Sequence, residues 1–175
     1  MGINLEKSAE EFATHNHTET NHTYNGRPYP LHLKMVVDVA QKFIHLIPED
    51  KREFVIACCW CHDTISSARV TYETIHEVFG EEFAEVIFAL TKEKGRTPED
   101  RTNDKYYRGI REVKYASFIR LCDRIADLQY SYTIRSSKLE FYKHDTPFLI
   151  CEMYNTEYKE MFDYLETLSG IEHNN

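Results

Sequence analysis

Residues 57–65 read Ala57-Cys58-Cys59-Trp60-Cys61-His62-Asp63-Thr64-Ile65, and they end an apolar helical run with an adjacent histidine and aspartate. The apolar character of the run, which begins near Glu49, places it at the centre of the fold. An imidazole and a carboxylate side by side can bind one divalent cation, because borderline metals accept nitrogen and oxygen donors together. Two ligands do not complete a metal site, so we expect further ligands elsewhere in the chain.

Helical periodicity continues on both sides of this stretch, and no strand-like alternation of useful length interrupts it. We expect helices over residues 5–14, 31–46, 49–61, 71–79, 82–91, 113–130 and about 147–168. Thr71 can cap the fourth of these helices, and Gly80 follows its end. The pattern predicts an all-α fold, a single helical bundle over residues 1–175.

Two polar segments interrupt the helical pattern. Residues 15–25 carry His15, His17 and His22, which could suggest metal binding, but their irregular spacing favours a plain surface loop. Residues 92–103 contain Gly95 and Pro98, which break helical continuity, so we expect a second loop there.

The composition is that of a globular protein. Hydrophobic residues make up 42% of the 175 residues, and only six Gly and five Pro are present, which argues against a turn-rich all-β fold. The formal net charge of −8 makes binding to a nucleic-acid polymer unexpected. The charge is uneven, because residues 92–124 hold ten basic and six acidic side chains. This basic segment suits a small anion such as a nucleotide phosphate, although a solvated helix face with ion pairs is the alternative.

The sequence carries no sign of export or membrane insertion. Its first residues lack the basic and apolar regions of a signal peptide, and no apolar run approaches membrane-spanning length. Five cysteines, an odd number, are typical of reduced thiols rather than a disulfide framework. We therefore expect a cytoplasmic protein with no membrane partner, while a homo-oligomer stays open.

Cys58-Cys59-Trp60-Cys61-His62 also matches the Cys-x-x-Cys-His pattern of covalent haem attachment. The match lies in a strongly apolar helix rather than in an attachment loop, and it comes without an export signal, so a haem electron carrier is only the third hypothesis, which a Soret band on purification would reveal. A zinc knuckle through Cys58 and Cys61 lacks a second ligand pair at finger spacing.

Two further residues are candidates to join the doublet. His32 lies in the first turn of the expected helix 31–46, where a single histidine is usually exposed or capping. Asp123 lies off the main apolar stripe of its helix, but Ile119 and Ala126 flank it, which indicates an acid that faces the interior. Taken alone, Asp123 would be an ion-pair partner of Arg120 or Arg124.

Together these residues carry a family pattern over about residues 26–130. A histidine is followed 30 positions later by a His-Asp doublet, and an aspartate follows 60 positions after that. The pattern resembles the HD superfamily of metal-dependent phosphohydrolases. It is most similar to the branch that hydrolyses the alarmone guanosine bis(diphosphate), on four motifs: Gly26-Arg27-Pro28-Tyr29-Pro30-Leu31-His32, then His62-Asp63-Thr64 with Phe79-Gly80, then Thr91-Lys92-Glu93-Lys94, and Leu121-Cys122-Asp123-Arg124-Ile125-Ala126-Asp127-Leu128.

The resemblance implies an all-helical domain that binds one divalent metal through His32, His62, Asp63 and Asp123. Manganese is the expected ion, with Mg²⁺, Fe²⁺, Ni²⁺ and Zn²⁺ as alternatives. The resemblance also implies that Lys94 binds phosphate. Asp127, one turn beyond Asp123, faces the same side of the helix and could meet a ribose or a ligand histidine.

One departure from the family pattern concerns catalysis. The alarmone hydrolases have a Glu-Asp pair where this chain has Ser66 and Ser67, and a hydroxyl cannot replace a carboxylate as general base near neutral pH. Ser66 and Ser67 are therefore expected only to contact substrate, and Glu73 or Glu77 are the remaining candidates for a base.

The sequence thus predicts a hydrolase that cleaves a phosphate ester or pyrophosphate bond in a small nucleotide, with a metal-activated water as nucleophile. A catalytically inactive domain that binds metal and nucleotide as a sensor is the alternative, favoured by Ser66 and Ser67.

Overall fold

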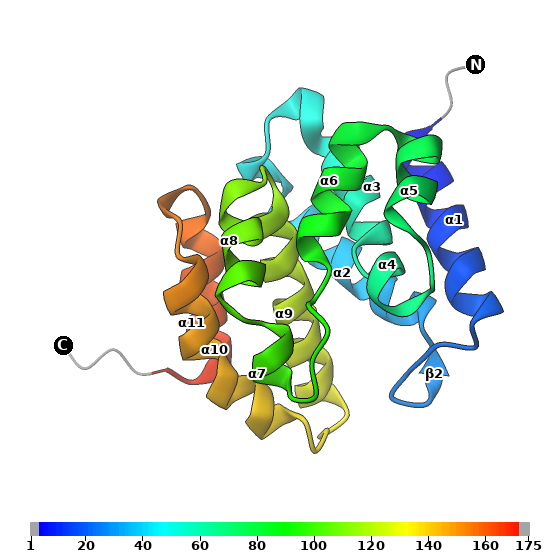
Figure 1. Cartoon of the computed structure of the whole chain (residues 1–175). Coiled ribbons are helices and arrows are strands. Elements are labelled where there is room, and N and C mark those ends of the chain that lie inside the picture. The colour runs from blue at the N-terminus through cyan, green and yellow to red at the C-terminus, as the bar shows by residue number, and fades with distance from the viewer. Residues whose placement is uncertain (1–3, 172–175) are drawn as a thin grey trace.

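The computed structural model describes residues 4–171, apart from the side chains of Pro98 and Glu99. Within this part of the chain the protein is almost entirely helical (Figure 1). The longer helices are α1 (Leu5–Glu19), α2 (Pro30–Lys42), α3 (Arg52–Cys61), α5 (Tyr72–Phe79), α6 (Glu81–Leu90), α8 (Asp104–Glu112), α9 (Ala116–Thr133), α10 (Leu139–Met153) and α11 (Lys159–Ser169). Short turns complete them: α4 (Thr64–Ser67), α7 (Pro98–Arg101) and three 3₁₀ segments, Ile44–Leu46, Glu49–Lys51 and Thr156–Tyr158. The predicted all-α fold is confirmed.

Helices α3 and α9 form the centre of the molecule. Every residue of α3 from Val55 to Cys61 is buried, because α1, α2, α6 and α9 cover it from different sides. Helix α9 contacts α2, α3, α6, α8, α10 and α11, and Figure 1 shows it in the middle of the bundle with α1 and α11 on opposite sides. The expectation that the apolar run before the doublet is central is therefore correct, and the doublet begins where this buried helix ends.

The helix boundaries follow local chemistry where a cap is present. Thr71 accepts a hydrogen bond from the backbone N–H of Thr74, so α5 begins where the sequence predicts it. Gly80 adopts a positive φ of 90°, which an L side chain rarely allows, and this conformation separates α5 from α6.

The first polar segment is not a surface loop throughout. Helix α1 continues to Glu19, so His15 and His17 are helical, and His17 is fully buried. The side chains of Asn16 and Thr18 bond back to carbonyls one turn earlier, so their polar groups are satisfied within the helix. The burial of His17 could not be predicted from a polar sequence.

A small hairpin connects α1 to α2. Strands β1 (Thr23–Tyr24) and β2 (Arg27–Pro28) pair in antiparallel register, and Asn25 and Gly26 both take positive φ in the turn between them. Asn-Gly is the dipeptide that favours such a two-residue turn. Tyr24 of the hairpin contacts Asp127 of α9. Tyr29, which follows the hairpin, contacts Asp63 of the doublet.

Two other boundaries differ from the prediction. The expected tail helix 147–168 is instead two helices, α10 and α11, because Pro147 is accommodated inside α10 and the chain breaks at Tyr154. Helix α8, which the sequence analysis missed, begins where Asn103 accepts hydrogen bonds from the backbone of Lys105 and Tyr106. None of the described helices combines the length and apolar character that a membrane span requires.

Candidate metal centre

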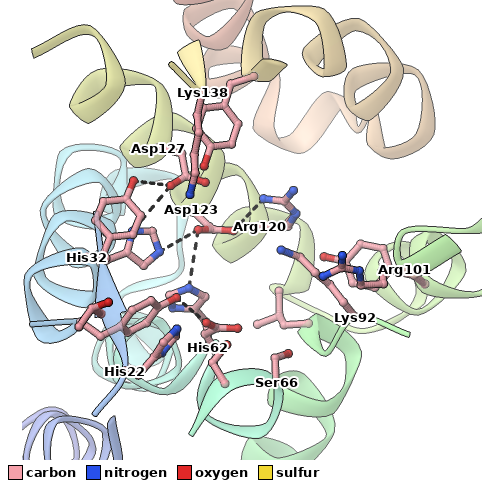
Figure 2. Close-up of a pocket in the computed structure, with 18 of the residues that line it drawn as sticks. His22, His32, His62, Ser66, Lys92, Arg101, Arg120, Asp123, Asp127 and Lys138 are labelled. Atoms are coloured by element: carbon pink, nitrogen blue, oxygen red, sulfur yellow. Dashed lines mark hydrogen bonds and ion pairs between the residues drawn. The ribbon is translucent and has the colours of Figure 1, made fainter. Parts of the chain in front are cut away.

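A cavity of about 440 Å³ opens between the hairpin, the ends of α2 and α3, the short α4 and the middle of α9 (Figure 2). The site residues predicted from sequence all line it: His32, His62, Asp63, Ser66, Ser67, Lys94, Asp123 and Asp127. The fold therefore brings to one place residues that lie up to 95 positions apart, from His32 to Asp127 (127 minus 32).

Three of these residues form a compact group, which we call the donor cluster: His32, His62 and Asp123. Each offers a ligand atom that lies within 4.8 Å of the other two. Asp123 Oδ1 is 3.1 Å from His32 Nε2 and 3.7 Å from His62 Nε2. Two imidazole nitrogens and a carboxylate oxygen at this separation are a donor set that suits a divalent transition metal.

The ring orientation of His62 supports this interpretation. Its Nδ1 lies 2.8 Å from the carbonyl oxygen of Cys59, one turn back in α3, so Nδ1–H donates to the backbone. The tautomer is thereby fixed, and Nε2 keeps its lone pair facing the cavity.

His32 is turned toward the acids of α9. Burial alone would lower the pKa of His32, but the hydrogen bond with Asp123 and the charges of Asp123, Asp127 and Asp63 outweigh burial and raise it. Nδ1 of His32 has no hydrogen-bond partner among the described residues, and its nearest carboxylate oxygen is Asp127 Oδ1 at 3.9 Å. Asp127 therefore lies behind the ring, while Nε2 faces the cavity.

Asp123 is largely buried and carries its charge beside a buried arginine. Its Oδ2 accepts a 2.8 Å hydrogen bond from Arg120, one turn earlier on α9, while Oδ1 faces the two histidines. Burial would raise the pKa of Asp123, but the hydrogen bond from His32 and the positive charge of Arg120 hold it well below its usual range. Asp123 therefore faces the interior and forms an ion pair with Arg120 at the same time. The two interpretations that the sequence allowed for this residue are compatible.

Asp63 is placed differently from the donor cluster. Its carboxylate lines the cavity but is not part of the three-residue group, and Oδ2 accepts a hydrogen bond from the hydroxyl of Tyr29. Burial would raise the pKa of Asp63, but the neighbouring charges of His62 and Lys92 and the hydroxyls of Tyr29 and Ser67 lower it. Asp63 is thus an oriented anion at the edge of the cluster.

The remaining predicted residues lie around the mouth of the cavity. Ser66 and Lys94 are exposed, and Ser67 is half-buried. Glu73 and Glu77, considered as bases, are exposed on α5 and do not line the cavity. Glu93 does line it, but its carboxylate pairs with Lys105 at 2.9 Å.

Several cations face the donor cluster. Lys92, Lys94 and Arg101 reach the cavity from residues 92–101, which we call the cationic segment, and Lys138 reaches it from the start of α10. Figure 2 shows Lys92 and Arg101 across the cavity from His32 and His62, with Arg120 between the two sides. The excess of basic residues in 92–124 signalled part of this arrangement, whereas Tyr24 and Lys138 gave no signal in the sequence. Tyr29 belongs to the first motif, but the sequence assigned no role to it.

Other cysteine-based sites are not supported. Cys58 and Cys61 are fully buried in α3, packed into the core, so a covalently attached haem would have no access to their thiols.

The fold and this cavity define a helical domain with a histidine–aspartate doublet beside a second histidine and a second aspartate. No protein-family model matches the chain, and no curated protein matches it in sequence. Among solved structures, it aligns with a metazoan ortholog of SpoT, described as hydrolysing ppGpp. That alignment has a TM-score of 0.74, 13% sequence identity, and coverage of 98% of this chain and 99% of the other. The chain therefore shares the fold of that hydrolase, and the helical fold expected from the motif resemblance is confirmed.

Proposed function

We propose that this protein is a metal-dependent phosphohydrolase that cleaves a phosphate ester or pyrophosphate bond in a small nucleotide. The observation that carries the proposal is the convergence of two buried imidazoles and a buried carboxylate on one side of a cavity whose other side is cationic. Such a cavity suits a divalent cation and a polyanionic substrate together, because the cation and the basic side chains both stabilise the phosphate charge.

His32, His62 and Asp123 would hold the ion, and Asp63 would be the fourth ligand. The donor set fits, because His62 presents a fixed Nε2 and Asp123 keeps one oxygen free of Arg120. Manganese is the first ion to test, with Mg²⁺, Fe²⁺, Ni²⁺ and Zn²⁺ as alternatives, because nitrogen and oxygen donors accept all of them.

When bound, the ion would polarise a phosphoryl oxygen and lower the pKa of a water molecule in the cavity. The chain's own side chains would do the rest. Arg120, Lys92 and Arg101 supply positive charge for the phosphates. Asp127 lies behind the His32 ring, where its negative charge helps to raise the pKa of the imidazole.

The substrate class follows from the cavity and from the structural neighbour. That neighbour acts on ppGpp, a small nucleotide with several phosphates. We propose a nucleotide of this kind for the present chain, contacted by Lys94, Asp127, Ser66 and Ser67, rather than a nucleic-acid polymer or a membrane. Ser66 and Ser67 separate this chain from the alarmone hydrolases, so the alarmone is one member of the test panel and not the assumed substrate.

The test is the release of phosphate and pyrophosphate from a nucleotide panel that includes the alarmones, in the presence of Mn²⁺. We expect turnover by the wild type and its loss in His62→Gln. His45→Gln is the matched control, because His45 is an exposed histidine that pairs with Glu160 outside the cavity. Equal turnover in both variants would show that the activity does not come from this site.

The second candidate function is a sensor domain that binds metal and nucleotide without cleaving it. The exposed Ser66 and half-buried Ser67 favour it, because no carboxylate stands in their place. This function predicts that a nucleotide raises the unfolding temperature of the Mn²⁺-loaded protein, while no phosphate appears during prolonged incubation. Phosphate release that depends on His62 would exclude it.

A further inference from the structure

Tyr29 holds Asp63 through its hydroxyl, and its own ring packs against two histidine rings. The residue immediately precedes α2 and is buried, with 7% of its surface exposed. Its ring stacks on His22 with centroids 3.8 Å apart and on His17 with centroids 4.4 Å apart. A phenol ring packed in this way has little freedom to reorient its hydroxyl, which donates to Asp63 Oδ2.

One of these two histidines belongs to the core. His17 is fully buried on α1, and its Nδ1 lies 3.0 Å from Nδ1 of His22. One imidazole must donate and the other accept, so this contact fixes both ring planes. The position of the Tyr29 hydroxyl is therefore set by His17 of α1 and by His22, which lies just before the hairpin.

The two carboxylates beside the histidines are restrained in the same way. Asp123 Oδ2 is bound by Arg120, which leaves Oδ1 facing His32 and His62. Asp63 Oδ2 is bound by Tyr29. A carboxylate that gives one oxygen to a fixed donor keeps the lone pairs of the other oxygen for a cation, and such donors commonly orient metal ligands.

From this parallel we propose that Tyr29 is a positioning residue, which orients Asp63 as the fourth ligand of the metal centre. The inference rests on the proposed function, because it needs the ion, but it concerns the affinity of the centre and not turnover. Tyr29 lines the cavity, but its assigned role does not require contact with the ion. It acts only through the Asp63 carboxylate.

Tyr24 provides a matched control within the same hairpin. Its hydroxyl donates to Asp127 Oδ1 at 2.6 Å, and its ring stacks on His32 with centroids 4.5 Å apart. Changing either tyrosine to phenylalanine thus removes one phenol–carboxylate hydrogen bond from the protein. Only Tyr29 is bonded to an expected ligand, so only its loss should weaken metal binding strongly.

The experiment is calorimetric titration of the full chain with Mn²⁺ alone, for wild type, Tyr29→Phe, Tyr24→Phe, Asp63→Asn and the double variant Tyr29→Phe/Asp63→Asn. We expect Tyr29→Phe to raise the Kd about ten-fold and Tyr24→Phe to raise it less than about two-fold. The double variant should bind no more weakly than Asp63→Asn, because Tyr29 has no effect once its partner carboxylate is gone.

A Kd for Tyr29→Phe that equals or falls below the wild-type value would overturn the inference, and so would additive losses in the double variant. A wild type that binds no Mn²⁺ would overturn the metal centre itself, which separates the two failures. Ser67→Ala supplies a second variant that leaves the buried ring stack intact. Ser67 lines the same cavity, and its hydroxyl, like that of Tyr29, lowers the pKa of Asp63, so we expect a Kd about three-fold higher. Unchanged affinity in both variants would contradict positioning by these hydroxyls.

Discussion

The two sides of the cavity are built in different ways. The donor cluster lies on buried helices, with 2% of His32 and 6% of His62 exposed, and each member has a defined partner. The cationic segment is exposed, and Lys92 and Lys94 reach into solvent at the mouth of the cavity. A buried side fixes geometry, whereas an exposed side supplies charge that rearranges around different substrates. Substitutions within the donor cluster should therefore have non-additive effects on metal affinity. Substitutions within the cationic segment should have additive effects on the free energy of substrate binding.

The largest effect is expected for Asp123→Asn. The substitution removes the carboxylate charge next to both histidines and leaves the buried Arg120 without its anion. We expect Mn²⁺ affinity to fall by more than about 100-fold, and the free energy of unfolding to fall by about 3 kcal/mol because a buried charge loses its partner. Calorimetry and urea unfolding measure the two effects. Asp38→Asn, an exposed acid on α2, is the control, and equal behaviour of the two variants would contradict the proposed role of Asp123.

The second prediction uses the buried histidine behind the donor cluster. Burial, the largest cause, lowers the pKa of His17 from 6.5 to about 4. A group whose folded pKa is depressed in this way binds protons preferentially in the unfolded chain. The contribution of His17 to the free energy of unfolding is therefore complete above pH 6.5 and is lost as the pH falls toward 4. The loss amounts to about 3 kcal/mol, or about 100-fold in the unfolding equilibrium.

Urea unfolding between pH 7 and pH 4 measures this dependence. His17→Gln should have a flatter pH profile than the wild type, whereas His144→Gln, at an exposed position on α10, should keep the wild-type slope. An unchanged slope in His17→Gln would mean that other groups dominate the acid sensitivity.

The third prediction asks whether the missing carboxylates limit turnover. Ser66→Glu combined with Ser67→Asp places acids at the rim of the cavity, where the alarmone hydrolases have them. If the wild type is a slow hydrolase, we expect kcat to rise ten-fold or more, since a positioned general base contributes at least that much. Steady-state phosphate release measures the change, and Ser8→Glu on α1 controls for added surface charge. A double variant that stays silent would favour the sensor function.

The smallest effects are expected on the cationic side. Lys92→Ala and Arg101→Ala each remove one exposed positive charge from the cavity, so we expect KM for a nucleotide to rise about five-fold while the Mn²⁺ affinity is unchanged. The double variant should show the product of the two effects, because the two charges are independent. Lys159→Ala, on α11, is the control. A cooperative loss, or a loss of metal, would show that this side is as rigid as the donor cluster.

Much of the architecture could be predicted because it depends on local patterns. The burial of α3 follows from an unbroken apolar run, and the boundary of α5 follows from Thr71. The inward direction of Asp123 follows from Ile119 and Ala126 beside it. The roles of His62 and Asp123 as ligands stay predictions, but their convergence with His32 is a property of the structure.

The rest could not be predicted because it depends on tertiary contacts. Nothing in a polar helix end indicates that His17 is buried, because α1 packs on α3, which comes from a distant part of the chain. The bond from Tyr29 to Asp63 joins residues 34 positions apart, and the hairpin that places Tyr29 is too short for alternation to reveal it. The separation of Asp63 from the three-residue group was likewise invisible in the sequence, where it is adjacent to His62.

The hydrogen bond from Tyr24 to Asp127 spans 103 residues, and the contact of His32 with Asp123 spans 91. Contacts of such sequence separation form late, since the chain must first close a long loop. The centre therefore exists only after α2 and α9 have docked, and a folding intermediate with α9 undocked would have no metal affinity. By linkage, any ion that binds there stabilises the whole fold by RT ln(1 + [L]/Kd), and it joins the two halves of the chain much as a disulfide would.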